Sequence, residues 1–399
     1  MQQTFQIIIS GQVQGVGFRP FIYGLADQFQ CNGSVCNNED GVLIHLNSVE
    51  EKARDFLTTI LKSAPEVSSI QSYSISELAF REFDDFRIVH SESNHKINIP
   101  LTPDFTICES CKIEIRDTNN RRYGYAFTTC TNCGPRYAVT KKFPFERANT
   151  TVSAFDMCIA CQTEYTNPND RRFHSQTNSC ADCGIKLKVT TSDGKTIVDA
   201  DSEIIKKVSK FILDGDIVAI KNTNGYLLCC DANNKLTIER LRAKKKRPTK
   251  PFAMLYPSIE RVKNDFKLSL SEEKALTSSV SPIIILNPKE SITDLEQESI
   301  APNLNQFGVM LPSSALLVLL MDELKIPIIA TSGNIHGSPI ISTKEDAIQQ
   351  LSGVTEYFLH HDLEVAFPQD DSVVRFAGEQ QIILRRSRGL APNYLKGTQ

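Results

Sequence analysis

Four Cys-x-x-Cys pairs between residues 108 and 183 constrain this chain more than any other feature. The first two pairs are separated by 18 residues, and after a further 24 residues the same C-x2-C-x18-C-x2-C spacing returns. Four thiolates complete a tetrahedral zinc site and leave no position for water, so we expect two structural zinc ions. The expected ligands are Cys108, Cys111, Cys130, Cys133, Cys158, Cys161, Cys180 and Cys183.

The residues around the cysteines repeat with a period of 50. Glu114 corresponds to Glu164, and Arg121-Arg122 corresponds to Arg171-Arg172. The repeat favours one zinc per repeat, although a crossed pairing, first pair with fourth and second with third, satisfies the same count. We expect the arginine pairs to be solvated or to bridge the core rather than to bind a polyanion. His174 is expected to be a surface or packing residue, because four sulfurs already complete the site.

The segment 108–184 is polar and poor in aliphatic residues. Such a segment cannot build a hydrophobic core of its own, so metal binding must supply the missing folding energy. Twelve cysteines, eight of them in pairs, indicate metal ligation in a reducing compartment rather than disulfides. The N-terminus has no basic or long apolar stretch and the apolar runs are short, so we expect a cytoplasmic protein without a signal peptide or a membrane span.

The first 90 residues alternate between strand and helix patterns. We expect strands at Phe5–Ile9, Ser34–Asn37, Val42–Leu46, Ile70–Ser76 and Phe86–His90, and helices at Pro20–Phe29 and Glu50–Leu61. The order βαββαβ predicts a ferredoxin-like domain. The polar segment Ser91–Asn98 is predicted to be a linker.

A glycine-rich loop follows the first strand and runs from Gly11 to Pro20. Its three glycines allow several N–H groups to converge on an anion at a helix N-terminus. Arg19 adds a bidentate donor for a phosphate or an acyl phosphate. On the next strand, Asn37 has the right chemistry to position a water molecule.

The motifs G-x-V-Q-G-V-G-F-R and G-x-V-x-N resemble the acylphosphatase family, over residues 4–91. The resemblance implies that Arg19 and the loop amides hold the phosphate while Asn37 orients the attacking water. Catalysis would be electrostatic, with no covalent intermediate. The implied phosphate loop comprises Gly15, Val16, Gly17 and Phe18.

From about residue 202 the pattern is again α/β, and the length suits a single domain. We expect helices at Glu203–Leu213 and Lys235–Lys246. One large mixed sheet is predicted from apolar runs at Ile217–Lys221, Phe252–Tyr256, Pro282–Leu286, Phe307–Leu311, Pro327–Ala330, Ser372–Phe376 and Gln381–Leu384.

Several polar motifs in this domain have ligand-binding chemistry. The segment 240–250 contains seven basic residues. Such a run is usually a solvated face, but here Pro248 and Pro251 fix its path into an apolar strand. A polar loop at 331–337 follows a strand, where ligand sites of α/β sheets gather. Asp370-Asp371 and the arginines after residue 384 add carboxylates for Mg²⁺ and cations for phosphates.

These motifs resemble the YrdC-like domain, which binds ATP and a carboxylated small molecule and forms an acyl adenylate. The resemblance implies that Lys245, Arg247 and Lys250 contact phosphates. It also implies that the nucleotide site is lined by Thr331, Ser332 and Asn334 and closed by Arg385 and Arg388. RNA binding by the basic run is a weaker alternative, because the net charge of the chain is −3.

The combined order of domains resembles the hydrogenase-maturation carbamoyltransferases, the HypF family. Segments such as C-T-N-C-G-P-R, K-K-R-P-T-K-P-F-A-M and R-R-S-R-G-L-A-P carry the resemblance. We expect an acylphosphatase-like domain at 1–91, a double zinc-finger module at 92–190 and a YrdC-like domain at 191–399. The family continues with a large transferase domain, which we expect this chain to lack. The sequence differs from the family pattern at Asn222–Asn224, Ser313–Leu316 and Leu363. We therefore expect the adenylation step to be less efficient.

The resemblance implies a two-step reaction. Carbamoyl phosphate is hydrolysed to carbamate and phosphate, and carbamate then reacts with ATP to form carbamoyl adenylate. In the full family the carbamoyl group passes to the C-terminal cysteine of a partner protein, toward a cyanide ligand of nickel–iron hydrogenase. The alternatives are a simple acylphosphatase with an inactive C-terminal half, and a zinc-finger/YrdC module that binds RNA. We expect the zinc module to act as a rigid bracket between the two catalytic domains.

Overall fold

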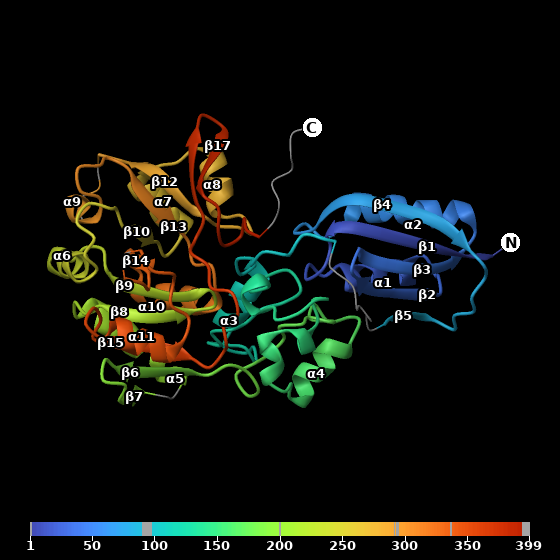
Figure 1. Cartoon of the computed structure of the whole chain (residues 1–399), viewed down its shortest axis with the longest axis horizontal. Coiled ribbons are helices and arrows are strands. Elements are labelled where there is room, and N and C mark those ends of the chain that lie inside the picture. Colours follow the sequence, from blue (N-terminus) through green and yellow to red (C-terminus); the bar gives the residue numbers. More distant parts are fainter. Residues whose placement is uncertain are drawn as a thin grey trace.

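The computed structural model describes residues 2–89, 98–198, 201–290, 292, 295–335 and 337–392, and for residues 201 and 202 the backbone alone. Of the predicted linker, only Asn98 lies within the described residues. Figure 1 shows three parts in a row: the N-terminal domain, the cysteine-rich module and the large C-terminal domain. The module therefore lies between the two domains in which phosphate-binding motifs are predicted.

The N-terminal domain is a five-stranded sheet in the order β4-β1-β3-β2-β5 with two helices. Ile7 and Ile9 of β1 face these helices and are fully buried with Phe56 of α2. The predicted ferredoxin-like arrangement is confirmed, and α1 begins at Phe18, before the predicted start at Pro20. The elements are β1 (Gln3–Gln12), α1 (Phe18–Gln28), β2 (Gly33–Asn38), β3 (Gly41–Ser48), α2 (Glu50–Ser63), β4 (Ser69–Leu78) and β5 (Phe86–Ile88).

The cysteine-rich module contains short helices and turns that pack against the C-terminal domain. Ile107 and Ile115 of the module are buried together with Ala315 and Val318 of the C-terminal domain. None of the hydrophobic clusters formed by the described residues belongs to the module alone. The predicted lack of an independent core is thus confirmed. The elements are α3 (Glu109–Arg116), α4 (Ile159–Thr166) and the 3₁₀ turns η1 (Tyr137–Val139), η2 (Arg147–Asn149) and η3 (Thr151–Ala154).

The C-terminal domain is built on a 12-stranded mixed sheet, as predicted, in the order β17-β16-β12-β13-β10-β14-β9-β8-β15-β6-β7, with β11 beside β12. Two clusters of buried side chains cover the sheet. Its strands are β6 (Leu187–Thr191), β7 (Thr196–Val198), β8 (Val218–Asn222), β9 (Gly225–Asp231), β10 (Ala253–Leu255), β11 (Phe266–Lys267), β12 (Ile283–Pro288), β13 (Phe307–Met310), β14 (Ile328–Ser332), β15 (Tyr357–His361), β16 (Val373–Ala377) and β17 (Gln380–Arg385).

Seven helices surround this sheet in the described part of the domain. Only the first two were expected from the sequence. They are α5 (Asp201–Leu213), α6 (Lys235–Lys244), α7 (Ile259–Asp265), α8 (Leu270–Leu276), α9 (Gln297–Ile300), α10 (Ala315–Leu324) and α11 (Lys344–Leu351). Across the described residues, every helix is too short or too polar to cross a bilayer.

The sheet begins earlier than the predicted domain boundary at residue 191. β6 starts at Leu187 and pairs antiparallel with β15 along its whole length. Strands β9 and β15 were not predicted, although both lie inside the sheet and are almost completely buried. The sheet therefore begins four residues after Cys183, the last of the predicted zinc ligands.

Candidate functional site

The eight cysteines form two separate clusters, one from each repeat. The first contains Cys108, Cys111, Cys130 and Cys133, and the second contains Cys158, Cys161, Cys180 and Cys183. Neighbouring sulfurs lie 3.6–3.8 Å apart in both clusters. A tetrahedral site with Zn–S bonds of about 2.3 Å requires sulfurs about 3.8 Å apart, so both clusters fit a structural zinc ion. Of the two pairings that the sequence left open, the structure has the one with one site per repeat.

The arginine pairs connect the two zinc sites reciprocally. Arg121 of the first repeat donates to Cys158 Sγ at 3.4 Å and to Cys180 Sγ at 3.1 Å, both in the second repeat. Arg171 of the second repeat donates to Cys111 Sγ of the first repeat at 3.3 Å. These donors oppose the negative charge of a zinc tetrathiolate. Of the two expected roles, solvated or bridging, the structure shows arginines that bridge the two repeats.

The second arginine of each pair binds the glutamate of the other repeat. Arg122, almost fully buried, binds Glu164 with an Nη2–Oε2 distance of 2.5 Å. Arg172 binds Glu114 in the equivalent way. Burial alone would raise the pKa of Glu164, but the hydrogen bonds and charges of the arginines hold it at about 2. The repeated Glu and Arg residues therefore join the two repeats into one unit.

The glycine-rich loop, Arg19 and Asn37 converge on a cavity of about 30 Å³. Gly15 and Gly17 have φ angles of +71° and +74°, a conformation that glycine adopts readily. Asn37 is 2% exposed, and its Oδ1 has no hydrogen-bond partner among the described residues. This unpaired acceptor fits the predicted water-positioning role, which stays a prediction.

The zinc module supplies the other wall of this cavity. Arg136 donates through Nε to the carbonyl of Gly15 and through Nη2 to the carbonyl of Thr131 at 2.9 Å. A Cβ atom on Gly15 would lie 3.2 Å from the Arg136 side chain, and one on Gly17 would lie 3.2 Å from that of Thr131. The loop glycines thus also permit the close approach of the module. Because of this approach, the phosphate loop faces the module rather than open solvent.

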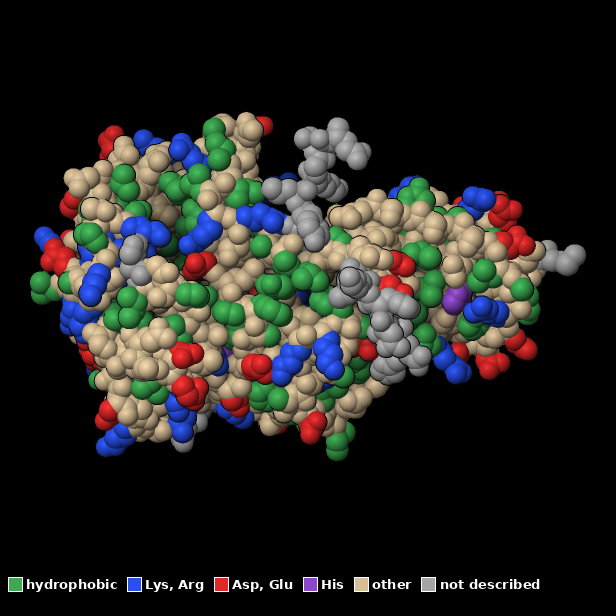
Figure 2. Space-filling model, viewed as in Figure 1, with side chains coloured by type: hydrophobic (Ala, Val, Ile, Leu, Met, Phe, Trp, Pro, Cys, Tyr) green, Lys and Arg blue, Asp and Glu red, His purple; other side chains and the backbone are tan. Residues whose placement is uncertain are grey.

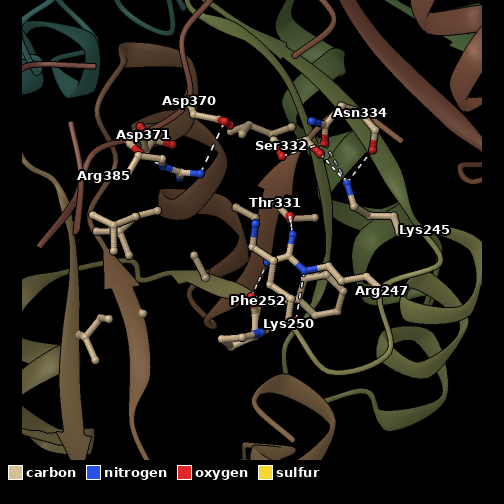
Figure 3. A pocket seen from close by; sticks show the side chains of 18 of the residues that line it. Lys245, Arg247, Lys250, Phe252, Thr331, Ser332, Asn334, Asp370, Asp371 and Arg385 are labelled. Carbon is tan, nitrogen blue, oxygen red and sulfur yellow. Dashed lines mark hydrogen bonds and ion pairs between the residues drawn. The ribbon is translucent and has the colours of Figure 1, made fainter. Parts of the chain in front are cut away.

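The polar motifs of the C-terminal domain meet at a cavity of about 370 Å³. On the face in view, Figure 2 shows Lys and Arg side chains around a hollow in the larger body. Figure 3 shows that these side chains come from separate elements and point toward one another. Of the predicted nucleotide-site residues, the cavity is lined by Lys245, Arg247, Lys250, Thr331, Ser332, Asn334 and Arg385.

Lys245 is 3% exposed, and its Nζ donates to the carbonyls of Ser332 at 2.6 Å and Asn334 at 2.8 Å. Burial, assisted by the charge of Arg247, lowers the pKa of Lys245 to about 7. Burial also lowers the pKa of Arg247 to about 10. Clustered, desolvated cations of this kind gain stability when an anion neutralises them.

The carboxylates of the cavity are held by arginines. Arg385 Nη1 lies 3.5 Å from Asp370 Oδ2, and its Nε donates to the carbonyl of Asp371 at 2.8 Å. Arg388 does not line this cavity: it lies behind Asp371, with an Nε–Oδ1 distance of 2.5 Å and a side-chain exposure of 4%. The structure thus places Arg388 outside the cavity that it was expected to close.

Comparison with known proteins agrees with this geometry. A family model for acylphosphatase matches residues 5–88, and one for the HypF finger matches residues 107–140 and 157–190. A third model, described as telomere recombination (Sua5, YciO and YrdC), matches residues 210–387. The chain is 41% identical to the carbamoyltransferase HypF of Synechocystis over 392 residues, 98% of this chain and 51% of the relative.

The chain is thus similar to HypF carbamoyltransferases over almost its whole length. It is 40% identical to the probable carbamoyltransferase HypF of Methanocaldococcus jannaschii over 99% of its own length and 51% of that relative. A crystal structure of full-length HypF in the phosphate- and nucleotide-bound form superposes with a TM-score of 0.93, at 38% identity, and is covered to 51%. The chain thus spans about half the length of the curated relatives it matches.

The departures from the HypF pattern gather around a third cavity, which lies between the zinc module and the C-terminal domain. This cavity of about 30 Å³ is lined by Thr223, Ser313, Ser314 and Leu363, and by Asp104 and Arg388. Burial raises the pKa of Asp104, although the backbone N–H groups of Arg136 and Ala138 oppose this change. None of the departing residues lines the nucleotide cavity. We therefore associate these sequence differences with the middle cavity, which lies between the acylphosphatase cavity and the nucleotide cavity, and not with the nucleotide cavity itself.

Sequence reasoning missed several residues of the acylphosphatase site. Glu146 binds Arg19, and the cavity walls include His174 and Gln176 of the zinc module. His174 was expected to be a surface or packing residue; it has a φ of +54° and packs against Phe173 and Tyr165 while lining the cavity. These residues belong to a different domain, so the motifs of the acylphosphatase domain do not reveal that they contribute to this site.

Proposed function

We propose that this chain hydrolyses carbamoyl phosphate at the acylphosphatase site and joins the resulting carbamate to ATP at the YrdC-like site. The observation that supports this most directly is that a cavity with Arg19 in the acylphosphatase-like domain and a cavity with Lys245, Arg247 and Lys250 in the YrdC-like domain are joined through one zinc module. The first step consumes water and yields carbamate and phosphate. The second step forms a C–O–P bond between carbamate and the α-phosphorus of ATP and releases pyrophosphate.

At the first site, Arg19 and the N–H groups of the loop would bind the phosphoryl group. Positive charge fixed around the three phosphoryl oxygens stabilises the transition state electrostatically. Asn37 Oδ1, which lacks a partner among the described residues, would accept a hydrogen bond from the attacking water. Only 8% of Arg19 is exposed, so this attraction acts in a partly desolvated space.

At the second site, Lys245, Arg247 and Lys250 would bind the phosphates of ATP. Thr331, Ser332 and Asn334 provide hydroxyl and amide groups on the same wall. We assign the Mg²⁺ that accompanies ATP to Asp370, because its pair with Arg385 is longer and more exposed than the buried pair of Asp371 with Arg388. The carbamate would approach from the side of Asp371 and Arg385.

The order of the cavities supports transfer of carbamate inside the protein. Arg136 lines the acylphosphatase cavity, and the preceding Gly134 and Pro135 line the middle cavity. Arg388 lines the middle cavity, and its partner Asp371 lines the nucleotide cavity. Each cavity thus shares a wall with the next. Carbamate decomposes in bulk water, so an enclosed route protects it.

The decisive experiment is ATP–pyrophosphate exchange measured with and without carbamoyl phosphate. Exchange that depends on carbamoyl phosphate, and that disappears in Arg19→Ala and in Lys245→Met, supports both steps. Phosphate release without exchange indicates a simple acylphosphatase. The final transfer of the carbamoyl group to the cysteine of a maturation partner is a further proposal for the whole protein.

The structure gives little support to RNA binding by the basic run. Lys245 and Arg247 turn inward, and Arg242 donates to backbone carbonyls such as that of Lys250 at 3.0 Å. Lys244 and Arg240 both approach Glu356. Most of the run is therefore engaged within the protein. Salt-sensitive RNA binding without either enzymatic activity would reverse this conclusion.

A further inference from the structure

The acylphosphatase site has a carboxylate on its phosphate-binding arginine. We propose that Glu146, supplied by the zinc module, is a gating residue that holds Arg19 until the phosphoryl group of the substrate displaces it. This inference rests on the proposed function. It goes further, because it makes the zinc module part of the phosphatase site and makes substrate affinity depend on a residue outside the acylphosphatase domain.

The contact is a desolvated ion pair. Arg19 Nη1 lies 2.9 Å from Glu146 Oε1, and the two side chains are 9% and 14% exposed. A guanidinium binds carboxylate and phosphate through the same planar set of donors. A phosphate and a carboxylate on one guanidinium would repel each other in this weakly screened space. Glu146 and the substrate therefore compete for Arg19.

The backbone around Glu146 is anchored to the phosphate loop. The N–H of Phe145 donates to Gln14 Oε1 at 3.3 Å, and Gln14 Nε2 donates to the carbonyl of Asn38 at 2.7 Å. The guanidinium of Arg136, which holds Gly15, lies 5.7 Å from the centre of the Phe145 ring. With its backbone held on the loop, Glu146 can release Arg19 most easily by a change of side-chain rotamer.

A larger cavity lies on the other side of the ion pair and provides space for that movement. It measures about 530 Å³ and is lined by Glu146, Asp156 and Tyr165. Arg19, His174 and Gln176 line both this cavity and the one at the phosphate loop. The loop cavity of about 30 Å³ has room for about two water molecules, less than carbamoyl phosphate needs. Arg19, the partner of Glu146, thus lies where the two cavities meet, and we expect the substrate to reach it from the larger one.

Neutralising Glu146 should strengthen phosphate binding, which is the opposite of what loss of a catalytic residue does. In Glu146→Gln we expect the Kd for inorganic phosphate and the KM for carbamoyl phosphate to fall about tenfold. We expect kcat to change less than about threefold, because Glu146 does not contact the reacting atoms once it is displaced. A purely structural role would raise KM or lower kcat instead.

The test uses the zinc-loaded full chain and inorganic phosphate as the probe, titrated by calorimetry beside steady-state hydrolysis. Glu50→Gln is the matched control, because it breaks an exposed Glu–Arg pair in the domain that carries Arg19 and should leave both constants unchanged. Zinc content and melting temperature establish that each variant is folded. If Glu146→Gln does not fold, Glu146→Asp carries the test, because its shorter side chain weakens the Arg19 contact in the same direction.

Phosphate affinity in the Glu146 variant that is equal to or weaker than wild type would overturn the proposal. An equal gain in the Glu50 control would also overturn it, since the effect would then come from net charge alone. If the wild-type chain binds phosphate but does not turn over carbamoyl phosphate, the proposed function fails. The phosphate titration still decides the role of Glu146 in that case.

Discussion

Replacing Arg172 with methionine should loosen the zinc site of the other repeat. The side chain of Arg172 is 4% exposed; it binds Glu114 and donates through Nε to the carbonyl of Thr129 at 3.0 Å. Removal of one partner from a buried ion pair costs about 3–5 kcal/mol. Glu114 keeps Arg171 at 2.6 Å, so we expect the lower end, about 3 kcal/mol.

We expect this loss of stabilising free energy to weaken the binding of zinc. Zinc affinity and folding of such a module are thermodynamically linked, so a destabilised ligand shell releases zinc more easily. A change of about 3 kcal/mol corresponds to a factor of more than about 100 in an equilibrium constant. The affected site should be the one with Cys108 and Cys111, although Arg172 itself lies in the repeat that contains Cys158.

The assay is a challenge with a chromophoric chelator, followed by alkylation of the released thiols and peptide mass spectrometry. In Arg172→Met, the cysteines of the first repeat should be labelled first. Arg122→Met is the mirror-image control and should expose the cysteines of the second repeat first. Release from the repeat that carries the substitution, or equal release from both, would refute the reciprocal arrangement.

Three further outcomes are expected. Burial lowers the pKa of Lys245 to about 7, so ATP should bind best below that pH, where the amine is charged. The affinity for ATP should fall from about pH 6 to about pH 8.5. Near pH 8, ATP binding should be accompanied by the uptake of a proton by Lys245. Calorimetry in two buffers of different ionisation enthalpy measures this, and a pH-independent affinity would contradict it. Partial removal of zinc should abolish carbamoyl-phosphate-dependent ATP–pyrophosphate exchange before it abolishes phosphate release. Parallel loss of both activities would contradict the expectation that the zinc module holds the two catalytic domains in a fixed arrangement. Arg388→Met should lower the free energy of unfolding, measured in urea, by about 3 kcal/mol, because it leaves the buried Asp371 unpaired. Arg385→Met is the control: its ion pair with Asp370 is partly exposed, so the loss should be less than about 1 kcal/mol.

Much of the fold follows from local patterns. The alternation of Phe5, Ile7 and Ile9 predicts a strand with one buried face, and the structure buries those three side chains. β9 was not predicted, because its residues Tyr226–Cys230 are buried on both faces of the sheet and so show no alternation of polar and apolar side chains. β15 contains His360 and His361, which are polar in sequence but are buried among Tyr226, Asn222 and Lys221.

The sequence by itself predicted the eight clustered cysteines, the glycine-rich loop with Arg19 and Asn37, and seven residues that line the large cavity of the C-terminal domain, but it misplaced Arg388. Each of these features is a motif of residues that are close together in the sequence, so the residue types and their spacing are enough to indicate it. The tertiary structure alone decided which cysteines share a zinc site, that each arginine pair serves the opposite repeat, and that Glu146 binds Arg19 across 127 residues of chain. Such contacts depend on how separate domains meet, and no spacing along the chain encodes the distance between two surfaces.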